Sequence, residues 1–334
     1  MTHKSVARLL VPGVAALCIA SSTQAATFAT FDPVGSIFTR PAGINASGVI
    51  TGFYAVDSKT AHAFVRAADG AITSFDPEGS VVTDPFAIDD NGRICGEWTG
   101  RNRSHEHAFV RESDGTITVF DPPHATQSWA VGFDANGNIA GSFGDQIIKV
   151  RGFIRASEGT IKVIDYPGSV LTKFNSISKA GAVTGLYMDG NFMMHGLLRA
   201  PDGGLTTFDV PGASGTVGET INSDGTITGE YFDANDVDHG FVRAADGTIT
   251  AFDPRRSVET DPYGINRSAA IVGTYQTANG VTHGFLRRTD GTIKGIDEPD
   301  ATSATMALGI NNGGMITGSF TGADGLTHGF VRTK

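Results

Sequence analysis

The sequence has little sulfur and little tryptophan: its 334 residues include two cysteines, six methionines and two tryptophans. Cys18 lies in an N-terminal apolar segment that we expect to be removed, which leaves Cys95 alone and excludes an internal disulfide. No later apolar run approaches the roughly 18 residues that a membrane-spanning helix needs. Helical periodicity is also missing from the rest of the chain, so we do not expect a helical domain.

Basic residues are outnumbered by acidic ones. Lysine and arginine together number 25 and aspartate and glutamate 35, a formal net charge of −10. Nucleic-acid binding requires a basic face that displaces counterions, so this class of function is excluded. What the chain has in abundance is glycine, 44 residues, with threonine, isoleucine, valine and phenylalanine carrying the apolar signal. This composition predicts short strands joined by many turns.

Residues 1–25 have the layout of a secretory signal peptide. Lys4 and Arg8 precede an apolar run from Leu9 to Ala20, and a small polar segment ends at Ala25. We expect cleavage after Ala25 and a single domain over 26–334. The protein is therefore predicted to be exported, either secreted to the medium or periplasmic, without a transmembrane segment.

The remainder of the chain is a repeat of 44 or 45 residues. Phe31-Asp32-Pro33 shows its first marker, whose aspartate recurs in seven copies: Asp32, Asp76, Asp121, Asp165, Asp209, Asp253 and Asp297. A second marker, His-Gly/Ala-Phe-Val-Arg, places histidine in six copies, with Arg151 in the third copy: His62, His107, His195, His239, His283 and His328. Seven copies in register make the whole predicted domain a repeat array.

Each copy reads as four short strands. In the sixth copy these are expected near Tyr263–Asn266, Ile271–Tyr275, His283–Arg287 and Thr292–Asp297, with tight turns that use Asn, Asp and Gly. A period of this length with four strands is typical of propeller blades. The chain begins with an unpaired fourth strand, 27–32, and ends with a third strand, 328–332. We therefore predict an all-β fold, a seven-bladed β-propeller closed by its N-terminal strand.

His62-Ala63-Phe64 and His107-Ala108-Phe109, in this repeat and behind a signal peptide, resemble the bacterial extracellular HAF-repeat family. The resemblance covers about residues 27–334, although four copies have glycine where the family name has alanine. It implies an exported repeat protein and brings no catalytic motif.

The repeated histidines and aspartates are expected to be structural, because a residue present in every copy does the same task in each copy. Each histidine should hydrogen-bond within its own or the adjoining blade, and the repeated arginines, such as Arg66 and Arg243, should lie near the aspartates. Cys95 is interpreted as a packing residue. The loop from Asp233 to Asp238 gathers carboxylates, but it lacks the spacing of a calcium loop and is interpreted as solvated. We expect no cofactor, no metal and no catalytic motif.

The function favoured by these observations is a binding module, acting as a monomer on an extracellular polysaccharide or a protein partner. The longer loops differ between copies, which makes their face the expected binding face. Its candidate contacts are apolar or aromatic residues assigned to these loops: Trp129, Tyr166, Phe192, Met193 and Met194.

The alternative is a polysaccharide hydrolase or lyase, since propellers host such chemistry and fold does not settle function. Such an enzyme would need carboxyl groups at positions that do not repeat. Glu78, Glu219 and Glu259 are the candidates.

Overall fold

The computed structural model describes residues 26–101, 105–145 and 149–333, so the expected signal peptide lies outside the described residues. All regular elements in this part of the chain are β-strands, as the all-β prediction requires. No helix among the described residues is long and apolar enough to cross a membrane.

The strands follow one another at short intervals from β1 to β28. The first half comprises β1 (Thr27–Phe31), β2 (Phe38–Ile44), β3 (Ile50–Ala55), β4 (Ala61–Arg66), β5 (Ile72–Phe75), β6 (Ser80–Ile88), β7 (Ile94–Gly100), β8 (Glu106–Arg111), β9 (Ile117–Phe120), β10 (Ala125–Phe133), β11 (Ile139–Asp145), β12 (Val150–Arg155), β13 (Ile161–Ile164) and β14 (Leu171–Ile177). The second half comprises β15 (Val183–Met188), β16 (Met194–Arg199), β17 (Leu205–Phe208), β18 (Gly215–Ile221), β19 (Ile227–Phe232), β20 (Asp238–Arg243), β21 (Ile249–Phe252), β22 (Ser257–Ile265), β23 (Ile271–Thr277), β24 (Thr282–Arg287), β25 (Ile293–Ile296), β26 (Thr305–Ile310), β27 (Ile316–Thr321) and β28 (Thr327–Thr333).

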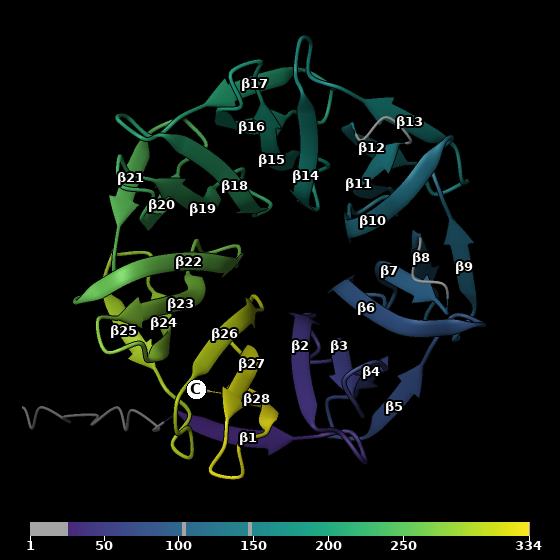
Figure 1. The fold of residues 1–334 in the computed structure, drawn as a ribbon, viewed down its shortest axis with the longest axis vertical. Coiled ribbons are helices and arrows are strands. Elements are labelled where there is room, and N and C mark those ends of the chain that lie inside the picture. Colours follow the sequence, from purple (N-terminus) through teal and green to yellow (C-terminus); the bar gives the residue numbers. More distant parts are fainter. Residues whose placement is uncertain (1–25, 102–104, 146–148, 334) are drawn as a thin grey trace, which may run out of the picture.

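Antiparallel neighbours in chain order form repeated four-stranded units. β14–β17, β18–β21 and β22–β25 are separate sheets. The remaining strands form one sixteen-stranded sheet, because single parallel pairings such as Ala61 with Val82 join successive units. Figure 1 shows the units set around a ring, with β2, β6, β10, β14, β18, β22 and β26 innermost. Side chains on these inner strands are therefore candidates to face the centre.

The first strand belongs to the same unit as the last. β1 runs antiparallel to β28, with Thr27 opposite Thr333 and Phe31 opposite Gly329 (Figure 1). The Phe28 ring lies 5.5 Å from that of Phe330, and Phe31 is buried. The two ends of the repeat array are therefore held together by backbone pairing and by apolar packing.

The predicted strands of the sixth copy are recovered, but the first was predicted too short. β22 begins at Ser257, whereas the prediction began at Tyr263. Pro262 lies inside this strand, where the register shifts between Pro262 and Gly264. A β-bulge tolerates proline because the local ladder hydrogen bond is already interrupted. The inner strands therefore extend farther than their sequence pattern indicates.

The repeated histidines pair with the repeated aspartates of the same unit. Nδ1 of His239 lies 2.8 Å from Asp253 Oδ2, and the six pairs span 2.6–3.1 Å. Aspartate also connects to the next unit in several copies, as where Thr83 Oγ1 donates to Asp76 Oδ1 at 2.6 Å. These contacts recur around the ring. They link the third and the fourth strand of a unit to the inner strand of the next unit.

The repeated arginines do not pair with those aspartates, contrary to the expectation. The Arg66 guanidinium lies 4.9 Å from the centre of the Phe31 ring, and Arg243 lies 5.2 Å from that of Phe208. In each case the phenylalanine belongs to the preceding unit. The arginine thus covers an apolar junction between units, where its flat cation interacts with the ring face.

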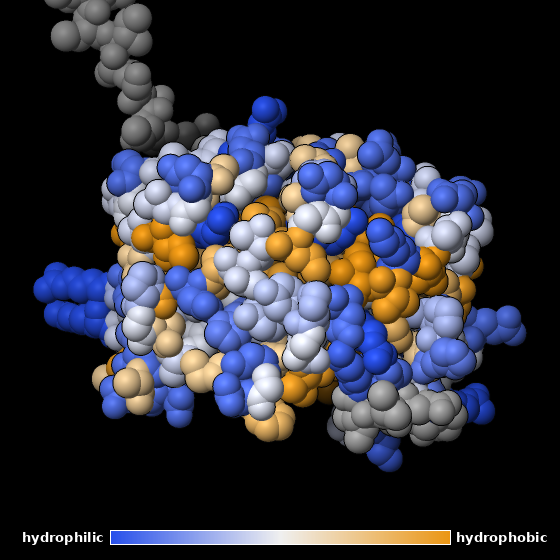
Figure 2. Space-filling model, turned by 90° about the horizontal axis from the view of Figure 1, so that it is seen from above, coloured by the Kyte–Doolittle hydropathy of each residue, from blue (hydrophilic) through white to orange (hydrophobic). Residues whose placement is uncertain are grey.

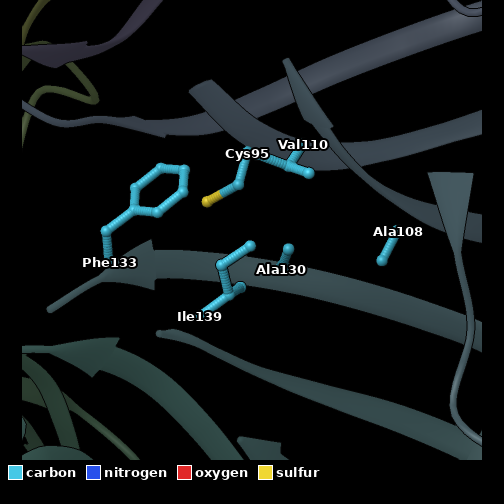
Figure 3. Packing of buried hydrophobic residues seen from close by; sticks show 6 residues of the cluster. All are labelled: Cys95, Ala108, Val110, Ala130, Phe133 and Ile139. Carbon is cyan, nitrogen blue, oxygen red and sulfur yellow. The ribbon is translucent and has the colours of Figure 1, made fainter. Parts of the chain in front are cut away.

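Cys95 is fully buried in β7. It packs with Ala108, Val110, Ala130, Phe133 and Ile139 (Figure 3). Burial raises the pKa of its thiol, which disfavours the nucleophilic thiolate. Its position agrees with a packing role.

The rim of the ring presents hydrophilic side chains with hydrophobic patches between them, as the edge-on view of Figure 2 shows. Val119 of β9 and Val163 of β13 are among the partly exposed apolar residues of the outer strands. Single exposed apolar residues are ordinary for a protein surface and indicate no site by themselves.

Candidate functional site: a central cavity

The inner strands enclose a cavity of about 1090 Å³. Residues from β2, β6, β10, β14, β18, β22 and β26 all contribute to its wall, which places it at the centre of the ring (Figure 1). Isoleucines near the ends of most inner strands line it, as do the tight turns that follow them. The cavity therefore reaches toward the tight-turn face of the ring.

Asparagine side chains tie neighbouring turns together at this mouth. Nδ2 of Asn222 donates to the Asn266 carbonyl, Asn266 donates to Asn311, and Asn311 donates to the Asn45 carbonyl at 2.9 Å. The interactions run from one unit to the next around the ring. They connect the turns that form the mouth.

A second interaction crosses the mouth between more distant units. The Lys179 ammonium donates to the Asp90 carboxylate, and both side chains are partly exposed. This ion pair satisfies two of the charges that line the opening.

A repeated β-bulge sets the composition of the wall. Each inner strand shifts register two residues before its final isoleucine or phenylalanine, and the residue skipped by the pairing lines the cavity. Bulges redirect side chains, and here they direct one per unit toward the centre. Around the ring these residues are Ala42, Phe86, Val131, Asn175, Glu219, Tyr263 and Leu308. The backbone geometry of the bulge thus repeats around the ring, whereas the chemical type of the residue at the bulge does not.

A second set of wall residues comes from two positions earlier in the inner strands. Arg40, Trp129 and Lys173 line the cavity from β2, β10 and β14. Glu97 joins them from β7, where it lies opposite Asp84 of β6. Two cations, an aromatic ring and carboxyl groups therefore share the wall with apolar side chains.

One carboxyl group of the cavity wall belongs to a larger cluster on β18, β19 and β22. Glu219 accepts a hydrogen bond from Asn175 Nδ2 at 3.2 Å. Glu230 and Asp261 form a hydrogen-bonded carboxyl pair next to it. Burial, reinforced by the charges of Glu219 and Asp261, raises the pKa of Glu230 to about 8. The cluster therefore retains a proton at neutral pH.

Asp84 and Glu97 form a second carboxyl pair across β6 and β7. Burial raises the pKa of Asp84 to about 7, opposed by the charge of Arg40. Burial and the nearby charges of Glu106 and Asp84 raise the pKa of Glu97 to about 8, opposed by Lys173. Asp84 Oδ1 and Glu97 Oε2 are buried without a hydrogen-bond partner. Carboxyls opposite one another on a sheet repel, and buried oxygens without partners are costly.

Trp129, predicted as a loop residue, lies instead within β10 on the cavity wall. Its Nε1 donates to Glu106 Oε2 at 2.9 Å, which fixes the ring. The reason for the difference is the same as in the sixth copy: the inner strand begins several residues earlier than its pattern indicates. Tyr166 lies in the connection after β13 and stacks on Tyr187 with ring centres 4.1 Å apart.

The other predicted contact residues lie near β16 and outside the cavity lining. Phe192 is 71% exposed in a turn with φ of +65°, and Met193 is partly exposed beside it. Met194 was assigned to the loop but begins β16, where it pairs with Met188. Of the predicted contact residues, Trp129 is the one that lines the cavity. A binding site on the long-loop face stays a prediction.

Of the carboxylates proposed for an enzyme, Glu219 lies in the cavity wall. Glu78 is exposed in the connection between β5 and β6, and Glu259 lies on β22, where its charge acts on Asp261 and Asp238. The Asp233 carboxylate accepts hydrogen bonds from the backbone of Asn235 and Val237, which lowers its pKa. That loop therefore uses its first carboxylate for its own turn.

Sequence reasoning missed Arg40, Glu97, Lys173, Glu230 and Asp261. The sequence does contain a signal for them: each occupies a fixed position of the repeat at which the residue type differs from copy to copy. Arg40, Glu97 and Lys173 line one cavity because the ring brings their strands together.

Neither a known family model nor a curated protein matches this sequence. Among solved structures, the chain is similar to virginiamycin B lyase from Staphylococcus aureus, with a TM-score of 0.63 at 16% identity, covering 93% of this chain and 100% of that one. A streptogramin B lyase gives a TM-score of 0.60 at 14% identity, with 91% and 97% covered. TolB from Acinetobacter baumannii gives 0.51 at 10% identity, with 83% and 78% covered. At these identities the likeness concerns the fold, that of β-propeller proteins.

Proposed function

We propose that this chain is a closed seven-bladed propeller that binds a small organic ligand in its central cavity. The pairing of β1 with β28 supports closure, because it joins the unmatched fourth strand to the unmatched third strand. Export to the periplasm or medium and kinship with HAF-repeat proteins, both drawn from the sequence, belong to the same proposal.

The observation that carries the proposed binding function is the chemical asymmetry of the cavity wall. The histidine–aspartate contacts recur from unit to unit, whereas the residue at the bulge changes from Ala42 to Glu219 to Tyr263 around the ring. Ligand sites combine apolar surface with a few placed polar groups in a cavity of hundreds of Å³. This wall has both, at a volume of about 1090 Å³.

Two aromatic substitutions test the cavity against the long-loop face. A thermal-shift screen of small organic compounds should find ligands that stabilise the wild type. We expect the Trp129→Ala variant to need at least five times more ligand for the same thermal shift, because the substitution removes part of the cavity wall. Phe192→Ala, a matched loss of an aromatic ring on the loop face, should leave the required ligand concentration unchanged. The opposite ranking would place the site on the loops.

A second candidate function is a hydrolase or lyase, favoured by the Glu230–Asp261 pair beside Glu219. A carboxyl that keeps its proton near neutral pH can donate it to a leaving group, while an ionised neighbour accepts one. Product release from glycans or from compounds that bind the cavity, lost in Glu219→Gln, would support this function. Binding without product release supports the first proposal.

A further inference from the structure

The deep part of the central cavity and the residues packed directly behind it hold more carboxyl groups than cations. Arg40 acts on Asp84, and Lys173 is shared between Glu97 and Glu219. Glu230 and Asp261 lie next to Glu219. Two further acidic groups, Asp238 and Glu259, act on Asp261. Two cations therefore serve five carboxyl groups. Glu97 and Glu219 line the cavity, and the other three interact with them from outside its lining: Asp84, Glu230 and Asp261.

The charged groups at the mouth do not change this balance, because they are already engaged. Lys179 pairs with Asp90, and Arg267 lies 3.7 Å from Asp224. The Asp134 carboxylate accepts hydrogen bonds from Asn138. The excess of carboxyl groups therefore lies in the deep part of the site. Burial keeps Glu97 and Glu230 protonated at neutral pH, and a cation beside them would favour their ionised form.

Glu97 lines the cavity next to aromatic surface, and its carboxyl group is incompletely hydrogen-bonded. Its Oε2 is buried without a partner, as is Oδ1 of Asp84 on the facing strand. Trp129 contributes its ring from β10, and Phe86 and Val131 contribute bulge positions of the same stretch of wall. Carboxylates beside an aromatic face favour a positively charged ligand, because the ring quadrupole and the carboxylate attract the same charge.

We infer that the ligand of this cavity is an organic cation, an amine or quaternary ammonium attached to an apolar body, with its charge held at Glu97 beside Trp129. The apolar body would lie against Phe86, Val131 and the isoleucines that line the cavity. The inference rests on the proposed binding function and names the class of its ligand.

Binding of a cation at this position should release protons. The groups that face Glu97 are Asp84 from β6, Glu106 from β8 and Lys173 from β14. Burial favours the protonated carboxyls, whereas a bound cation favours the ionised ones. The affinity for a cation should therefore rise with pH between about 5 and 9, and that for a neutral compound should stay constant.

Three probes with the same phenyl ring and different charge test the inference by isothermal titration calorimetry. They are benzyltrimethylammonium, benzyl alcohol and benzenesulfonate. We expect the cation to bind at least tenfold more tightly than the anion at pH 8, with the alcohol between them. Glu97→Gln should weaken cation binding at least fivefold and leave benzyl alcohol unchanged. Glu78→Gln removes the same charge from an exposed loop and should have no effect on either.

Each outcome decides between the two proposals. Equal or tighter binding of benzenesulfonate overturns the cation inference but leaves cavity binding intact. Cation binding that ignores Glu97→Gln also overturns the inference, because the preference would then come from overall charge. Absence of binding by all three probes up to tens of millimolar overturns both proposals, provided each variant retains the wild-type melting transition.

Discussion

At the scale of single residues, buried carboxyl groups tie the stability of this fold to pH. Glu230 has a pKa of about 8 in the folded chain, against a usual value of 4.5. Between these values the folded state holds a proton that the unfolded state releases. The stability contributed by the protonated Glu230 is therefore fully present below about pH 4.5. It is lost as the pH rises through about 8.

Replacing Glu230 with glutamine should remove this decline. At about pH 5 both side chains are neutral and can donate to Asp261, so Glu230→Gln should unfold close to the wild type. At about pH 9 the variant should be more stable, by on the order of 2 kcal/mol, since it no longer holds an ionised carboxylate beside Asp261. Thermal melts at both pH values measure the difference. Destabilisation at every pH would show that the carboxylate is ionised and paired.

At the scale of elements, close packing of the first two strands of each unit leaves no room for side chains at one glycine position. A Cβ on Gly229 would lie 2.0 Å from the Val217 carbonyl oxygen of the facing strand. The same position in other units gives similarly short approaches, as at Gly52 and Gly96. These glycines lie next to the bulges that aim wall residues inward. The geometry of the site thus depends on them.

Gly229→Ala should therefore destabilise the protein by at least about 2 kcal/mol, because backbone must move to admit the methyl group. Gly190→Ala provides the control: nothing lies within 4 Å of its added Cβ and the turn is exposed. We expect that substitution to be neutral or slightly stabilising. Chemical denaturation of the two variants gives the comparison. Equal stabilities would contradict the close approach of the two strands.

At the scale of the whole molecule, β1 makes contacts with both the last unit and the first complete one. His328 Nδ1 lies 2.7 Å from Asp32 Oδ2, and the hydrogen bond to Asp32 raises the pKa of this histidine. Phe31 packs edge-on against Phe64 of the first complete unit. The N-terminal strand therefore connects the last unit to the first.

A chain that begins at Val34 should be much less stable than one that begins at Ala26. It loses the burial of Phe28 and Phe31, each contributing about 1.5–3 kcal/mol, and it exposes an edge of β28 to aggregation. Thermal unfolding and light scattering of the two chains measure these effects. Midpoints that agree within a few degrees would refute closure by this strand.

Much of the fold could be read from the sequence because the information is local and repeated. Four strands per copy follow from turns at Asn, Asp and Gly, and a structural hydrogen bond for each repeated histidine follows from its recurrence. The partner of the histidine, such as Asp253 for His239, was not predicted. The burial of Cys95 follows from its place in a strand. The full length of the strand that contains Pro262 was not predicted from the same local pattern. A proline within a strand depends on a bulge, and the bulge is recognised only from the pairing with the neighbouring strand.

The cavity wall was decided by the tertiary structure. Arg40, Glu97, Lys173 and Glu219 lie in different copies, and nothing local in the sequence brings them together. Ring geometry turns each inner strand toward one centre, and the bulge determines which of its residues points there, because a shift of one residue moves a side chain to the opposite face. The repeat therefore specified the scaffold by itself, whereas the chemistry of its centre exists only once the copies surround it.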